Sequence, residues 1–265
     1  MGSKFKDDIY LFDNIKEEIQ PKNLRKSLNL NFMKTASETR RAGEYDLPYI
    51  LSSINMYPDF IALYGEFSKY KLTYRTCVAF YEYDQVFDGI KGIWNAIYHD
   101  IRKWQFYYLN RFACVKYFIA PDYSLCGDVN KIENLHRLFR ARIVSIWLTM
   151  NLKVPVIPNI TYSNPEIFPN MLDGMEDCEI VAFSTKGLMK SADARNLLRE
   201  SIKFTVDNLK KLKAIIVYTV SIFDETIYDL FSYATDNGVR LIIPRNTLRD
   251  RNIFKWEESN GKIHS

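Results

Sequence analysis

Acidic, amide and hydroxyl side chains follow several predicted strands, at the positions where those strands end. Asp122 comes directly after an apolar run and a proline, so its backbone is constrained and its carboxylate is placed at a strand end. A carboxylate in this position can bind a hydroxyl group or a divalent ion, or act as a base with a raised pKa. The alternative is an Asx-turn, in which the side chain only satisfies backbone N–H groups. Asp122 is therefore the first candidate for a catalytic residue.

Three further residues are candidates for catalysis. Asn159 ends the next predicted strand, whereas Arg140 and Arg142 lie on opposite edges of the apolar face of the helix between the two strands. Arginines in such positions usually extend toward solvent or pair with a carboxylate such as Asp122 or Asp128. Binding of an anion or a phosphate is the alternative interpretation of both arginines.

The remaining candidates are expected to bind a ligand. They share a place at or just after a predicted strand end, and they are Glu82, Asp84, Ser124, Asp128, Thr161, Ser184, Thr185 and Arg245. Asp128 is also the expected N-cap of the following helix. Glu82 and Asp84 alternate with tyrosines, so both acids lie on one side of an extended strand. With Asp122 they could form a carboxylate cluster for Mg²⁺ or Mn²⁺, the alternative being exposed acids at a strand end.

The sequence lacks most short motifs of known mechanism, and this excludes several classes of site. The turn Ser184-Thr185-Lys186-Gly187 resembles a phosphate-holding turn but lacks the spacing of a P-loop. The four cysteines form no CxxC pair, and with three histidines they give no zinc or iron–sulfur spacing. The dinucleotide pattern GxGxxG, the serine elbow GxSxG and the metalloprotease pattern HExxH are also absent from the sequence.

Strand and helix patterns alternate from residue 72 onward. Short apolar runs rich in β-branched residues predict strands at 72–81, 113–120, 154–160, 179–184, 214–219 and 239–243. Helical spacing predicts helices at 89–109, 129–150, 192–212 and 224–236. About six βα units in this order predict an α/β fold with a mainly parallel sheet. An incomplete TIM-like barrel, which we favour slightly, and an open doubly wound sheet both fit, and in both a ligand binds at the carboxyl ends of the strands.

The chain divides into three predicted parts. Residues 1–70 form a helical and irregular arm, residues 71–246 form the α/β domain, and residues 247–265 form a polar tail, frayed or packed at an edge. The arm begins with a predicted helix over 4–20 that Pro21 ends, and its segment 47–70 is expected to be irregular but packed.

Composition restricts the class of protein. The net charge of +4 is too small for a protein that coats DNA, although a local basic groove is compatible with it. The aromatic content of 15% is high, which indicates either a tyrosine-rich core or stacking platforms for bases or sugars. No run of about 18 apolar residues is present, so we expect no membrane span. Thiols in a chain without a secretory signal predict a cytoplasmic protein.

Several of these residues carry a resemblance to a known family. The run Ala120-Pro121-Asp122-Tyr123-Ser124-Leu125, followed by Asp128, by FRAR at 139–142 and by VIPNITY, resembles domain of unknown function 4417, which shows SPDFSLY, YR.R and VIPTISW in that order. VAFSTKG at 181–187 and YDQVF at 83–87 are similar to the VAISTVG and DDYQFE of that family. The resemblance covers about residues 75–220, and Cys126 departs from the tyrosine that members often have. It implies an intracellular protein of a bacterium, phage or other mobile element, and it implies no particular activity.

Two functions from different classes fit these observations. A polar pocket at the strand ends would bind or process a nucleotide, a nucleic acid or another phosphorylated ligand. Alternatively, the chain is a non-catalytic interaction module that binds a host or phage protein, as an inhibitor or replication accessory, through the aromatic segment 45–70. A third interpretation, direct DNA binding, predicts a steep loss of affinity with salt.

Overall fold

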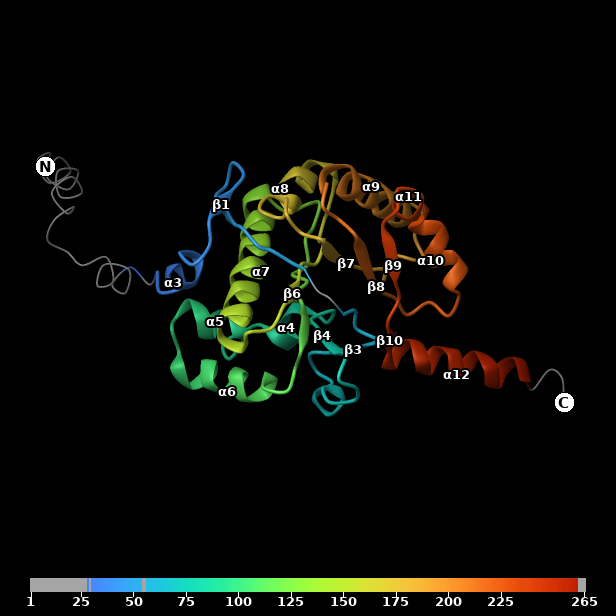
Figure 1. Cartoon of the computed structure of the whole chain (residues 1–265), viewed down its shortest axis with the longest axis horizontal. Helices are drawn as coiled ribbons and strands as arrows, with labels where there is room; N and C mark the ends of the chain where they lie inside the picture. Colours follow the sequence, from blue (N-terminus) through green and yellow to red (C-terminus); the bar gives the residue numbers. More distant parts are fainter. Residues whose placement is uncertain (1–27, 29, 54–55, 262–265) are drawn as a thin grey trace, which may run out of the picture.

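Parallel strands form two sheets in the computed structural model, which describes residues 28, 30–53 and 56–261 (Figure 1). The larger sheet has the order β10-β3-β4-β5-β6, and the smaller has the order β7-β8-β9. The strands of the larger sheet are β3 (Phe60–Leu63), β4 (Thr76–Ala79), β5 (Tyr117–Ile119), β6 (Val156–Ile157) and β10 (Arg245–Asn246). Those of the smaller sheet are β7 (Ile180–Ser184), β8 (Ala214–Tyr218) and β9 (Arg240–Ile242). An antiparallel pair, β1 (Arg41–Ala42) with β2 (Leu47–Pro48), completes the strands of the described residues.

The two sheets are joined at two places. Asn159, which follows β6, forms a single parallel bridge with Ala182 of β7. On the other side, only Ile243 and Pro244 separate β9 from β10, so one run of chain pairs first with β8 and then with β3. The ladders found among the described residues do not close into a complete barrel. The predicted α/β fold with a mainly parallel sheet is confirmed, in an open form.

Each sheet has one face in a shared apolar core and one face under helices. The shared core takes alternate residues from strands of both sheets, including Ile61, Ala79, Ile119, Ile157, Ile180 and Ile216. The opposite faces pack against helices in two further cores. This alternation follows from the period of two along a strand, and it explains why nearly every strand position is apolar. Because both faces of each sheet are apolar, the carboxyl ends of the strands are where polar side chains can lie.

Ten α-helices lie among the described residues. They are α3 (Met33–Ala36), α4 (Asp84–Phe87), α5 (Ile93–Tyr98), α6 (Arg102–Phe112), α7 (Lys131–Leu152), α8 (Phe168–Leu172), α9 (Ala192–Asn208), α10 (Asp224–Leu230), α11 (Ser232–Asp236) and α12 (Thr247–Gly261). Two 3₁₀ turns, η1 (Phe67–Lys69) and η2 (Pro165–Ile167), accompany them. In Figure 1, α7 runs along one side of the molecule and α12 extends away from the body at the C-terminal end. The predicted helix over 4–20 lies outside the described residues.

The start or continuity of three helices differs from the prediction, and one of them, expected over 224–236, is the two helices α10 and α11. The helix expected over 89–109 is two helices, α5 and α6, because Asp100 adopts a positive φ of 53° that ends the first. Asp128 does not cap α7, whose N-cap position is Asn130. The turn before α7 is held instead by Asn134, which exchanges two hydrogen bonds with the backbone of Cys126.

Two segments expected to lack regular structure are ordered elements. The segment 47–70 contains β3, which lies between β10 and β4 in the larger sheet. Its four residues are all apolar, and a short apolar run does not by itself distinguish a strand from irregular packed chain. Residues 247–261 of the tail, which was expected to be frayed or packed at an edge, form α12.

Candidate functional site

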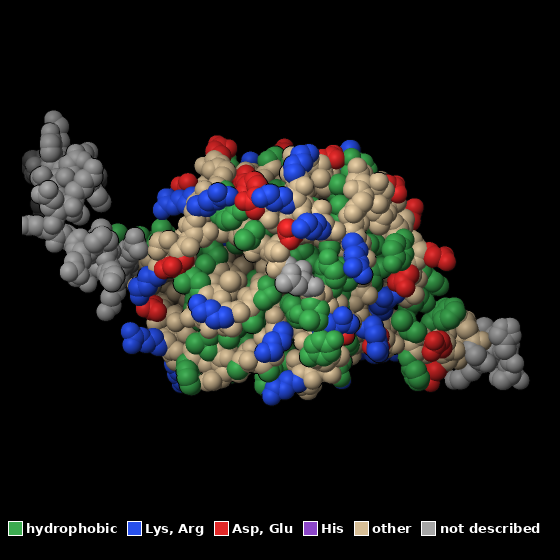
Figure 2. All heavy atoms as spheres, viewed as in Figure 1, with side chains coloured by type: hydrophobic (Ala, Val, Ile, Leu, Met, Phe, Trp, Pro, Cys, Tyr) green, Lys and Arg blue, Asp and Glu red, His purple; other side chains and the backbone are tan. Residues whose placement is uncertain are grey.

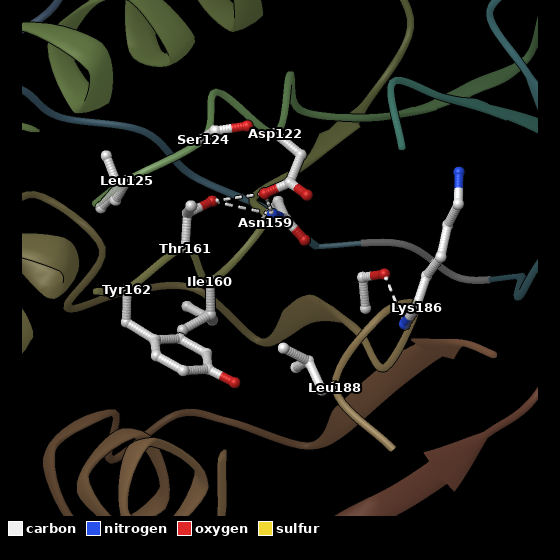
Figure 3. A pocket seen from close by; sticks show the side chains of 10 residues that line it. Asp122, Ser124, Leu125, Asn159, Ile160, Thr161, Tyr162, Lys186 and Leu188 are labelled. Carbon is white, nitrogen blue, oxygen red and sulfur yellow. Dashed lines mark hydrogen bonds between the residues drawn. The ribbon is translucent and has the colours of Figure 1, made fainter. Parts of the chain in front are cut away.

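A polar pocket with a volume of about 230 Å³ opens at the carboxyl ends of β5, β6 and β7. Polar side chains from three connections enter it, together with apolar side chains on its lower wall (Figure 3). Its lining consists of Asp122, Ser124, Leu125, Asn159, Ile160, Thr161, Tyr162, Ser184, Lys186 and Leu188. We call it the strand-end pocket. It lies where ligands bind in parallel α/β proteins.

Asp122, Asn159 and Thr161 form a hydrogen-bonded cluster in the strand-end pocket. The side-chain amide of Asn159 donates to Asp122 Oδ1 at 2.7 Å and to Thr161 Oγ1 at 2.8 Å. The hydroxyl of Thr161 donates to the same oxygen of Asp122 at 2.9 Å. Both bonds to the carboxylate use Oδ1, so Oδ2 is the oxygen left for a ligand (Figure 3).

Two residues from other strands position this cluster. The hydroxyl of Tyr81, which follows β4, donates to Asn159 Oδ1 at 2.7 Å and so fixes the orientation of the amide. Tyr81 is buried and its ring stacks on Tyr218, with a centroid separation of 4.8 Å. Lys186 follows β7, and its ammonium group donates to the Tyr81 carbonyl oxygen at 2.8 Å. The lysine thus reaches from the smaller sheet to the larger one beside the pocket.

The electrostatic setting of Asp122 is unusual for a carboxyl group. Its burial raises the pKa to about 6 from the ordinary value of 3.8. The hydrogen bond from Thr161 opposes this rise, the charge of Asp84 adds to it, and Asn159 and Lys186 oppose it. A carboxyl group with a pKa near neutrality can both accept and return a proton, which is what general acid–base catalysis requires.

Asp84, at the start of α4, and Ser124, in the loop after β5, connect these two segments. The backbone N–H and the hydroxyl of Ser124 both lie 3.2 Å from Asp84 Oδ1. Arg137 of α7 donates to Asp84 Oδ2 and to the Ser124 carbonyl oxygen, each at 3.0 Å. Arg137 also donates to Glu133, one turn earlier on α7. These contacts hold one wall of the strand-end pocket in place.

Five of the predicted ligand-binding residues lie outside the pocket lining, namely Glu82, Asp84, Asp128, Thr185 and Arg245. Glu82 accepts a hydrogen bond from the Gly65 N–H at 2.6 Å, and Asp128 is exposed. Thr185 is buried and donates to the Thr219 hydroxyl at 2.8 Å. Arg245 pairs with Asp250 at 3.0 Å and lies in β10, at the edge of the larger sheet opposite β6.

The two arginines predicted to be catalytic are also outside the strand-end pocket. Arg140 pairs with Asp88 and lies over the ring of Tyr123, with 4.4 Å between its guanidinium carbon and the ring centroid. Arg142 is buried and donates to the Met171 carbonyl oxygen at 2.8 Å. Burial lowers the pKa of Arg142 to about 10. Both contacts hold α7 to its neighbours. Arg140 pairs with a carboxylate, as expected, but with Asp88 rather than Asp122 or Asp128, whereas Arg142 contacts a backbone carbonyl oxygen.

A metal site has no support from the described residues. No group of three or more histidine, cysteine, aspartate or glutamate side chains there could hold a metal ion. Glu82, Asp84 and Asp122 each have separate partners, so they do not form the carboxylate cluster considered for Mg²⁺ or Mn²⁺.

Sequence reasoning missed three residues of this site. In the sequence Tyr81 has only the signal of a strand residue, and Lys186 only that of a turn. Arg137 lies outside the apolar face of α7, whereas Arg140 and Arg142 flank that face, so the helical spacing does not single out Arg137. Long-range hydrogen bonds link residues that are 53 to 105 positions apart, and a single sequence contains no signal for them.

The fold and the site define an α/β protein with a carboxyl group of raised pKa in a polar pocket at the carboxyl ends of parallel strands. The chain belongs to the family described as Domain of unknown function (DUF4417), whose family model matches residues 40–236. The resemblance noted in the sequence is thereby confirmed. No curated protein and no solved structure matches the chain. Within the described residues, none of the helices has the length and apolar character needed to cross a membrane.

Proposed function

We propose that the strand-end pocket binds a small phosphorylated ligand with hydroxyl groups, such as a nucleotide, and that Asp122 exchanges a proton with it. The observation that carries this proposal is the convergence of Asp122 and Lys186 in one pocket. The carboxyl group has a pKa of about 6, whereas the ammonium group supplies a positive charge. A hydroxyl group of the ligand can form a hydrogen bond with the Asp122 carboxyl group, and a phosphate can pair with the Lys186 ammonium group.

The size of the pocket supports a small ligand. Its volume of about 230 Å³ is below the roughly 300–1,000 Å³ of pockets that enclose drug-sized molecules. A single nucleotide or a sugar phosphate therefore fits better than a folded nucleic acid. Leu125, Ile160 and Leu188 give the pocket an apolar wall against which a ring can pack.

A ligand panel with paired variants tests the proposal. The unmodified protein is screened with nucleoside mono-, di- and triphosphates and with sugar phosphates, by the rise of its thermal unfolding midpoint. Lys186→Ala is expected to weaken the responding ligand by about 10- to 100-fold, because a charge-assisted hydrogen bond is worth about 1.5–3 kcal/mol. Asp122→Asn is expected to abolish turnover of that ligand.

Two exposed residues supply matched controls. Asp128→Asn and Lys190→Ala make the same chemical changes close by in the chain, at side chains that do not line the pocket. They should leave both affinity and turnover unchanged. The proposal fails if no phosphorylated ligand shifts the midpoint, or if the control variants weaken binding as much as Lys186→Ala does.

The alternative, a protein-interaction module, is favoured by one observation. Four large apolar or aromatic side chains are exposed among the described residues of the segment 45–70, namely Tyr45 at 38%, Leu51 at 64%, Met56 at 41% and Phe67 at 58%. Exposed apolar groups of this kind are frequent at protein interfaces. A double variant, Leu51→Ser with Phe67→Ser, would abolish capture of a partner by such a module and would leave ligand binding in the strand-end pocket intact.

A further inference from the structure

A second surface combines exposed aromatic rings with positive charge. It consists of Lys91 and, on α6, Arg102, Lys103, Trp104, Phe106 and Tyr107, and we call it the α6 surface. A pocket of about 280 Å³ lies beside it, between α6 and the residues 85–92 that follow β4. Neither the strand-end pocket nor any contact described above uses these side chains.

Two aromatic rings of the α6 surface, those of Phe106 and Tyr107, do not belong to the core, whereas Trp104 packs against it. Phe106 is 66% exposed and Tyr107 is 43% exposed, whereas Tyr108 and Phe112 of the same helix are buried. The ring of Tyr107 lies edge-on to that of Trp104, with 6.0 Å between centroids. Two exposed rings on a helix whose inner face is already filled by other aromatics indicate a surface that contacts something else.

Basic side chains predominate around these rings. The sequence of α6, RKWQFYYLNRF, contains three basic residues and no acidic one. The ammonium groups of Lys91 and Lys103 lie 5.4 Å and 5.5 Å from the Trp104 ring centroid. The acids nearest in the chain, Asp88 and Asp100, already pair with Arg140 and Lys34. The lower edge in Figure 2, where α6 lies in Figure 1, shows basic side chains among apolar ones.

We propose that the α6 surface binds single-stranded nucleic acid, with bases stacked on Phe106 and Tyr107 and phosphates paired with Lys91, Arg102 and Lys103. Stacking on aromatic side chains and pairing of the backbone with lysine or arginine are the two contacts by which such strands bind without sequence preference. A duplex exposes few base faces to solvent, because its bases are stacked on one another. Its bases are therefore not available for this stacking. The site is separate from the strand-end pocket, and the inference does not depend on the function proposed for that pocket.

Binding of a fluorescein-labelled oligothymidine, followed by anisotropy at several salt concentrations, tests the inference. The logarithm of the affinity should fall with the logarithm of the salt concentration, with a slope of about −2 for three phosphate contacts. Lys103→Ala should make that slope shallower by about 0.7. Phe106→Ala should weaken binding about tenfold, the size expected for the loss of one stacked base.

Matched variants separate stacking from general charge. Phe254→Ala removes a comparably exposed ring, 59% exposed, from α12 and should leave the affinity unchanged. Tyr107→Phe keeps the ring and should bind like the unmodified protein, whereas Tyr107→Ala should not. Asp122→Asn alters only the strand-end pocket and should have no effect on the oligonucleotide.

Three results would overturn the inference. One is the absence of oligothymidine binding at low salt. Another is equal affinity for a duplex of the same length, since base faces would then have no part in binding. The third is binding of vesicles with anionic lipid that Phe106→Ala weakens while oligothymidine binding is unchanged, because the surface would then recognise a membrane.

Discussion

Replacing Asp122 by asparagine is expected to stabilise the protein at neutral pH while removing its function. Asparagine has the shape of aspartate and keeps an oxygen that can accept the hydrogen bonds from Asn159 and Thr161. It cannot be charged. The substitution therefore removes the cost of a buried negative charge and leaves the packing of the strand-end pocket in place.

The magnitude follows from the pKa of the folded state. Because the pKa of about 6 lies above the ordinary value of 3.8, the folded protein holds this proton more tightly than the unfolded chain does. Stability from this group is complete below about pH 4 and is lost as the pH rises through about 6. The full loss is about 3 kcal/mol, since a tenfold change in proton affinity corresponds to about 1.4 kcal/mol. Asp122 borders a water-accessible pocket, so solvent screening reduces this to about 1–3 kcal/mol.

Urea unfolding of both proteins between pH 4 and pH 8 measures the difference. The free energy of unfolding of Asp122→Asn, relative to the unmodified protein, should increase by about 1–3 kcal/mol from pH 4 to pH 8. All other titrating groups cancel in this comparison. A difference that does not change with pH, or one that decreases, would refute the reasoning, because Asp122 would then be an ordinary carboxyl group.

Three further predictions concern other parts of the fold. Tyr81→Phe removes the hydroxyl that donates to Asn159 and should lower the free energy of unfolding by about 1–2 kcal/mol, as measured in urea. Cys126 is exposed, whereas burial raises the pKa of the fully buried Cys77, so a thiol reagent should modify Cys126 in the native protein and Cys77 only after unfolding. Gly174→Ala should cost about 1–3 kcal/mol, because φ is +78° and a Cβ atom would lie 3.0 Å from the backbone of Tyr49; thermal unfolding measures this loss.

The parallel fold was predictable because each strand and its helix carry a local signal. Strands β7 and β8 are continuous apolar runs, and their predicted bounds differ from the observed ones by one residue at an end. The break at Asp100 was not predictable, since the apolar spacing continues across it and only the conformation of one residue ends the helix. Helix α12 was missed because its outer half makes few contacts and shows little amphipathic pattern.

The location of the candidate site was more predictable than the identity of its residues. Asp122, Asn159, Thr161 and Ser184 line one pocket because parallel strands end at the same edge. The place of Arg142 was not predictable, because the edge of an apolar face has the same sequence pattern whether the side chain ends in a pocket or against a backbone carbonyl oxygen. The functional roles of these residues stay predictions.

Asn159 takes part both in the junction of the two sheets and in the strand-end pocket. Its backbone forms the bridge between the two sheets, whereas its side chain contacts Asp122 and Tyr81 in the strand-end pocket. The free energy of occupying the pocket and the free energy of holding the sheets together are therefore linked through one residue. Linkage is reciprocal, so a ligand that binds more tightly when the bridge is formed must strengthen the bridge by the same factor. Exchange of the Ala182 amide hydrogen, which donates across this junction, would then slow in proportion to occupancy of the pocket.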